Sequence, residues 1–261
     1  MRGHFRQLIT WLALSMPLLV CGQYGFVGFE NVSAKLGDLY EPIESCLEDH
    51  LGFLWFATQT GLYQYDGYQL KAFQHHVYDS TSLSSLTIWH IAEDHEGHIW
   101  VATTYGINLL DRRTGTFKRF LPFPEVASNK AQNTIQLLHF GQDAHCWVAG
   151  AHTLYLFETS TGVFQEVLDA EGNPVGHSIH SILEEENGTI LCGTSDGLLK
   201  ILPGDTAFTH VSPDPDSTSV FNKDIVAIAE GDNGELWLWK RNCPSQRLSA
   251  HMPLILSMLM Q

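Results

Sequence analysis

The sequence predicts an all-β protein made of four-stranded antiparallel β-propeller blades, about four and a half of them, in an incomplete ring. Three observations support this prediction: a motif recurs at a nearly constant period, each copy divides into short apolar runs, and residues after the first 22 lack helical periodicity. The motif has anchor positions 55, 100, 147, 191 and 237, with spacings of 45, 47, 44 and 46 residues. A repeat of roughly this size is one propeller blade. A β-solenoid is the alternative architecture, but its repeats are usually shorter.

Residues 1–22 have the pattern of an export signal, because two arginines precede the apolar run Leu8–Val20. This run is too short to cross a bilayer comfortably. Cleavage after Gly22 would leave a mature periplasmic chain that begins at Gln23. Lipoprotein anchoring through Cys21 is the weaker alternative, since the residue before it is a valine where a smaller side chain is needed.

Each repeat is expected to supply four strands in the same order. An apolar run forms the inner strand, at Ile43–Glu48, Ile88–Glu93, Ile135–Phe140, Ile179–Glu184 and Ile225–Glu230. A turn leads to the strand that carries the anchor tryptophan, a second turn to a short third strand, and a third turn to a fourth strand ending at Phe73, Phe120 or Val167. The predicted blades span about residues 40–85, 86–132, 133–176, 177–222 and, in part, 223–239. Residues 240–261 form a tail without the repeat, as a frameshift would produce.

The charge of the chain excludes some classes of partner. Its 261 residues carry a formal net charge of −15. Nucleic acid and anionic lipid both reward clustered Lys and Arg, so neither is expected as the main partner. We also expect no membrane span within this chain after the signal, because the apolar run in the tail is too short.

The chemically reactive side chains favour structural roles. Carboxylate pairs such as Glu48-Asp49 and Glu93-Asp94 recur at one repeat position, whereas catalytic pairs are normally unique. We therefore expect them to cap turns, and we expect no catalysis. The 14 histidines lack the spacing of a metal site, so no metal and no cofactor are expected. The cysteines after the signal are interpreted as buried small apolar residues rather than disulfides; they are Cys46, Cys146, Cys192 and Cys243.

The tryptophans at one repeat position are expected to form the core between blades; they are Trp55, Trp100, Trp147 and Trp237. Because this chain holds few blades, the faces around Trp55 and Trp237 are expected to be exposed. A ligand is expected at the channel mouth, where inner strands begin and second strands turn into third strands. The candidate residues there are Gln59, Thr60, Trp89, His90, Thr104, Tyr105 and His152.

The motif resembles the two-component regulator propeller repeat. Its first copy reads Leu47-Glu-Asp49-His-Leu-Gly52-Phe-Leu-Trp55-Phe-Ala-Thr58-Gln-Thr-Gly61-Leu62. The resemblance implies the exported sensor region of a hybrid two-component histidine kinase, in which the blades precede an immunoglobulin-like domain, one membrane helix and a cytoplasmic kinase. The chain departs from this pattern after Trp237-Leu238, where the expected Gly-Thr-x-x-Gly-Leu is missing.

These observations predict a ligand-sensing region that is not catalytic in this chain. The ligand implied is a glycan or another small extracytoplasmic molecule, and the propeller faces are expected to self-associate. Two alternatives remain: a propeller-fold glycosidase or lyase, and a non-functional gene fragment.

Overall fold

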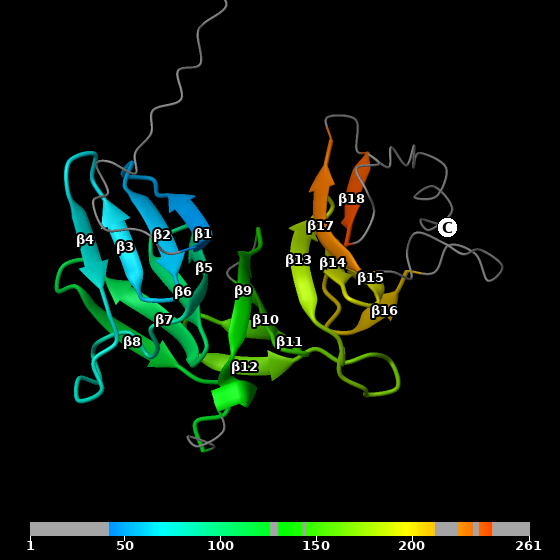
Figure 1. Cartoon of the computed structure of the whole chain (residues 1–261). Helices are drawn as coiled ribbons and strands as arrows, with labels where there is room; N and C mark the ends of the chain where they lie inside the picture. The colour runs from blue at the N-terminus through cyan, green and yellow to red at the C-terminus, as the bar shows by residue number, and fades with distance from the viewer. Residues whose placement is uncertain (1–41, 126–129, 143–144, 212–223, 232–234, 242–261) are drawn as a thin grey trace, which may run out of the picture. The chain divides into compact units, whose positions relative to one another are not determined.

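The computed structural model describes residues 42–125, 130–142, 145–211, 224–231 and 235–241. These residues form four four-stranded antiparallel sheets and one two-stranded sheet, each a propeller blade or part of one (Figure 1). The all-β propeller prediction is confirmed. The signal at residues 1–22, the start at Gln23, the lipid anchor at Cys21, the residue Cys243 and the rest of the tail lie outside the described residues.

The strands follow the chain in each sheet from the inner to the outer edge. Blades 1 and 2 contain β1 (Ile43–Glu48), β2 (Leu54–Thr58), β3 (Leu62–Tyr65), β4 (Leu70–Phe73), β5 (Ile88–Glu93), β6 (Ile99–Thr103), β7 (Gly106–Asp111) and β8 (Thr116–Phe120). Blades 3 to 5 contain β9 (Ile135–Phe140), β10 (His145–Gly150), β11 (Leu154–Glu158), β12 (Val163–Glu166), β13 (Ile179–Glu184), β14 (Ile190–Thr194), β15 (Gly197–Ile201), β16 (Phe208–His210), β17 (Ile225–Glu230) and β18 (Leu236–Lys240). One 3-10 helix, η3 (Lys130–Asn133), precedes β9. None of the described residues forms a helix long and apolar enough to cross a membrane.

Neighbouring blades contact each other through their inner strands: β1 packs on β5, β5 on β9, β9 on β13, and β13 on β17. Among the described residues the first and fifth blades do not meet to close a ring (Figure 1). Each new blade buries two apolar side chains of its inner strand against the blade before it. In blade 2 these are Ile88 and Ile91, which join a core that also contains Trp55.

The same two positions of β1 are exposed, because none of the described residues precedes blade 1. Ile43 pairs with Thr58 as Ile88 pairs with Thr103, yet 47% of Ile43 is exposed and Ile88 is fully buried. Cys46 is exposed for the same reason. The prediction of a buried cysteine is therefore wrong for Cys46 and confirmed for Cys146 and Cys192, and all three are free thiols.

The side chains of the anchor tryptophans face the following blade, whereas the buried inner-strand residues face the preceding one. Trp55, Trp100 and Trp147 are buried between blades as predicted. The expectation that the face around Trp55 is exposed is wrong, because blade 2 covers it. Trp237 lies in the last described strand and is only partly buried.

An aspartate holds the turn between the first two strands of blades 1 and 2. Asp49 Oδ1 accepts the N–H groups of Leu51 and Phe53, and its Oδ2 accepts the indole N–H of Trp55 at 2.7 Å. Asp94 receives the equivalent bonds, with the indole N–H of Trp100 at 2.8 Å. The interpretation of these carboxylates as turn residues is confirmed.

Candidate functional site

Two of the predicted channel-mouth residues lie in the β2–β3 turn of blade 1. Gln59 is exposed, and its amide donates to Glu44 Oε1 at 2.9 Å. The Thr60 N–H donates to Thr58 Oγ1 at 3.1 Å, and its hydroxyl lies 3.3 Å from the Tyr63 hydroxyl. Both side chains are thus held by neighbours within their own blade.

The equivalent turns of blades 2 and 3 contact the loops that lead into inner strands. The Thr104 hydroxyl lies 2.7 Å from that of Ser85, before β5, and the Thr104 carbonyl accepts a bond from Thr134 Oγ1, before β9. The Tyr105 N–H donates to Thr103 Oγ1. His152 is exposed, and its carbonyl accepts the N–H of Gly176 at 2.9 Å. These turns and loops share one end of the blades.

The remaining two candidates, Trp89 and His90, are half-buried on β5. Neither Trp89 Nε1 nor His90 Nδ1 has a hydrogen-bond partner among the described residues. Burial, with a smaller contribution from the nearby His139, lowers the pKa of His90 to about 4. The structure thus distributes the seven candidates over the edges of three blades, and their role in binding stays a prediction.

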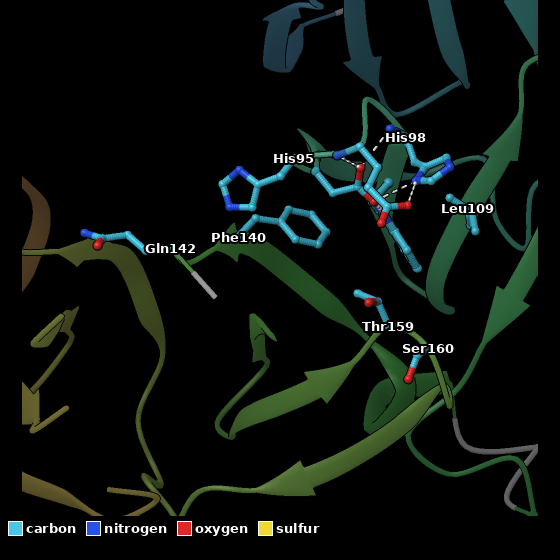
Figure 2. A pocket seen from close by; sticks show the side chains of 10 residues that line it. His95, His98, Leu109, Phe140, Gln142, Thr159 and Ser160 are labelled. Carbon is cyan, nitrogen blue, oxygen red and sulfur yellow. Dashed lines mark hydrogen bonds and ion pairs between the residues drawn. The ribbon is translucent and has the colours of Figure 1, made fainter. Parts of the chain in front are cut away.

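A groove between blades 2 and 3 lies at the opposite end of the strands. We call it the second groove, because an equivalent first groove lies between blades 1 and 2. The second groove has a volume of about 370 Å³ (Figure 2). Blade 2 contributes Asp94, His95, Glu96, His98, Trp100 and Leu109, and blade 3 contributes Phe140, Gln142, Thr159 and Ser160. Figure 2 shows the ring of Phe140 across from Leu109, with Thr159 and Ser160 at one end.

Asp94 is the carboxylate at the floor of the second groove. Its Oδ2 accepts the indole N–H of Trp100, and His98 Nδ1 lies 3.0 Å from the same oxygen. Burial alone would raise the pKa of Asp94, but the hydrogen bonds from Trp100 and His98 outweigh burial and hold that pKa below its usual value. The carboxylate is therefore ionised at neutral pH.

A first groove lies at the same place between blades 1 and 2, and the side chain of Arg112 occupies it. Its remaining volume is about 180 Å³. The guanidinium donates to Asp49 Oδ2 at 2.7 Å, to Glu93 Oε1 at 3.2 Å and to the Gly97 carbonyl at 3.2 Å. It also lies 5.8 Å from the ring centre of Trp55, within range of a cation–π contact.

Neither groove is predicted by the repeat pattern of the sequence. The repeat pattern predicts a turn before each fourth strand, at Thr114-Gly115 in blade 2 and Thr161-Gly162 in blade 3. It does not show that the turns Asp111–Gly115 and Glu158–Gly162 differ at their second position, which is Arg112 in one and Thr159 in the other. Aligning the repeats at these turns would have revealed the difference. The groove itself depends on which way these side chains point, and the repeat pattern does not specify that.

The repeat in blade 2 matches a known family model. Residues 82–105 match the family model described as two component regulator propeller. They run from the end of the loop before β5 to the turn after β6. A search of the curated proteins finds no match.

Solved structures with the same fold include extracellular domains of bacterial sensors. One, from a hybrid two component system of B. thetaiotaomicron, is 23% identical with a TM-score of 0.61, over 77% of this chain and 27% of that chain. A second domain from the same organism is 23% identical with a TM-score of 0.60, over 75% and 26%. PorZ, a surface component of the type-IX secretion system of Porphyromonas gingivalis, is 16% identical with a TM-score of 0.57, over 76% and 31%. At these identities the likeness establishes the propeller fold.

Proposed function

We propose that this chain is the exported, ligand-sensing propeller region of a two-component sensor, with no catalysis of its own. The observation that carries the proposal is the two component regulator propeller repeat at residues 82–105, within blades similar to extracellular domains of hybrid two component systems. The chain spans 27% of the first of these domains, so the signalling activity of a whole sensor is part of the proposal.

The ligand we propose is a glycan fragment or another small molecule rich in hydroxyl groups, bound at the channel mouth. Two candidate residues on β5 have buried nitrogens without a hydrogen-bond partner among the described residues, Trp89 Nε1 and His90 Nδ1. An unpaired buried polar group costs roughly 1–3 kcal/mol, and a ligand hydroxyl that reached it would remove that cost. Tyr105 and His152 would add an aromatic face and an exposed imidazole.

The location we propose is the periplasm, reached through the signal at residues 1–22. The similar structures are extracellular domains. Fractionation of cells that express the full chain tests this step. The mature protein should begin at Gln23 and be found outside the cytoplasm, whereas cytosolic protein that retains Met1 contradicts it.

Thermal denaturation with a set of oligosaccharides tests the ligand proposal. At least one should raise the melting temperature of the wild-type chain, and Tyr105→Ala should abolish the shift. Tyr78→Ala is the matched control, because Tyr78 is fully exposed in the loop before β5 and lies outside the candidate set. A shift that Tyr105→Ala leaves unchanged would contradict the proposed position of the site.

A propeller-fold glycosidase or lyase finds no supporting observation in the described blades. The carboxylates of Asp49 and Asp94 stabilise turns and accept the indole N–H groups of the neighbouring tryptophans. Glu93 Oε2 accepts the N–H of His50 from blade 1, and Glu184 Oε2 accepts that of Gln142 from blade 3. Each of these four carboxylates thus has a bonding role at a turn or between blades.

A further inference from the structure

The first and second grooves are two copies of one repeat feature. The turns Asp111–Gly115 and Glu158–Gly162 have the same geometry: in each, the glycine N–H donates to the carbonyl four residues earlier at 2.8 Å. Both glycines have positive φ, 74° and 77°. Arg112 and Thr159 therefore occupy the same position, facing the tryptophan of the preceding blade.

The first groove shows which chemical group this position accommodates. The Arg112 guanidinium bonds two carboxylates and one carbonyl, and it lies over Trp55. Its planar fork of donors matches these acceptors better than an ammonium would. The groove is therefore built around a guanidinium carried on an aliphatic stem.

The second groove keeps most of this environment without the arginine. Thr159 is too short to reach across it, and the cavity is about twice as large, about 370 Å³ against about 180 Å³. Asp94 corresponds to Asp49, but 14% of its side chain is exposed, compared with 0% for Asp49. An ionised carboxylate thus faces an unfilled space.

The walls of the second groove differ from those of the first at two equivalent repeat positions. Phe140 stands at the position of Glu93, so one carboxylate is replaced by an aromatic ring. Glu96, which is exposed at the rim, supplies a carboxylate on the other side. A cation in this groove would meet Asp94 and Glu96 and could lie against the Phe140 ring.

In the second groove, the His98 imidazole lies next to the Asp94 carboxylate, where the Arg112 guanidinium lies next to Asp49 in the first groove. In the first groove, Asp49 Oδ2 accepts bonds from Trp55 and Arg112. In the second, Asp94 Oδ2 accepts a bond from Trp100 and has His98 Nδ1 at 3.0 Å. Phe53 is the blade 1 counterpart of His98, since the Asp49 N–H donates to the Phe53 carbonyl as the Asp94 N–H donates to the His98 carbonyl.

We propose that the second groove binds an arginine side chain presented by a peptide ligand or a partner protein. Its guanidinium would replace His98 on Asp94, pair with Glu96 and lie against Phe140. A sugar would bind less well in this groove, because Trp100 is only 2% exposed and offers no open face for stacking. This proposal does not rest on the proposed function, since the groove lies at the opposite end of the strands from the channel mouth.

Calorimetric titration of the full chain with acetyl-Gly-Arg-Gly-amide tests the proposal. The matched control is the same peptide with citrulline, which keeps the shape of arginine but has no charge. We expect the arginine peptide to bind at least about tenfold more tightly. Equal affinity for the two peptides, or no binding of the arginine peptide, overturns the proposal.

Three variants test whether the arginine peptide binds in the second groove. Thr159→Arg should fill the second groove as Arg112 fills the first and abolish binding, and Glu96→Gln should weaken it several-fold. His98→Phe, which restores the residue of blade 1, should tighten it. Glu96 is exposed, so its variant keeps the test decisive if Thr159→Arg fails to fold. Unchanged affinity in Glu96→Gln, or in a folded Thr159→Arg, overturns the assignment.

Discussion

Arg112 and Asp49 lie on different blades, and the guanidinium donates to the carboxylate at 2.7 Å across the first groove. Asp49 is fully buried. Burial alone would raise the pKa of Asp49, but bonds from the Trp55 indole and the Arg112 guanidinium outweigh it and hold the pKa below its usual value. The pair therefore ties the turn of blade 1 to the outer half of blade 2.

Replacing Arg112 should destabilise the protein because it leaves two carboxylates, those of Asp49 and Glu93, without their cation. We expect Arg112→Thr to lower the free energy of unfolding by about 2 kcal/mol, less than for a fully buried pair, since Arg112 is partly exposed. Urea denaturation measures this. The matched control is Arg113→Thr in the same turn, where the side chain is exposed and the change should stay within about 0.5 kcal/mol. Equal effects of the two variants would contradict the role of Arg112.

Trp100 should contribute most of the packing between blades 2 and 3. Its ring contacts Phe120, Phe140 and Phe157, with ring centres 5.6 to 5.9 Å apart. Trp100→Ala should cost roughly 3–5 kcal/mol, as large aromatic truncations in cores do. Trp239→Ala is the control, because that side chain is largely exposed, and it should be nearly neutral. A near-neutral Trp100→Ala in a folded protein would show that the ring is not a core residue.

His90 should make the stability of the protein sensitive to acid. Its pKa is about 4 in the folded state, against an ordinary value of 6.5. Between these pH values the unfolded chain binds a proton on His90 that the folded chain does not, so stability falls as the pH is lowered through this window. The loss should reach roughly 3 kcal/mol.

The variant His90→Leu isolates this contribution, because Leu137 occupies the same position on β9. Denaturation at a series of pH values should show a smaller loss for the variant than for the wild type between pH 6.5 and about 4. His152→Leu, at an exposed position, should behave like the wild type. Parallel pH curves for His90→Leu and the wild type would contradict the lowered pKa of His90.

The cysteines should differ sharply in reactivity. Burial raises the pKa of Cys192 to about 12 and raises that of Cys146 as well, so neither forms a thiolate at neutral pH. Cys46 is exposed. Alkylation of the native protein followed by peptide mapping should modify Cys46 quickly and the other two only after denaturation. Rapid modification of Cys192 in the native state would contradict the packing of blade 4.

The sequence predicts the strands well because their pattern depends on local chemistry. The five inner strands begin and end where the apolar runs do, for example at Ile88 and Glu93. The exposure of Cys46 could not be predicted, since the same strand position is buried or exposed according to whether a blade precedes it. The second groove could not be predicted either, because it requires knowing that Arg112 reaches across a blade boundary and that Phe140 replaces a carboxylate.

Each blade is stabilised by the blade that follows it, and the self-association of the chain tests this most directly. Light scattering combined with calorimetry on residues 23–261 measures this. We expect self-association, driven by the apolar face around Ile43, and we expect Ile43→Asp to reduce it without loss of fold. Ile88→Asp, at the same repeat position but buried, should unfold the protein. A monodisperse wild-type monomer with a sharp cooperative melt would contradict the claim.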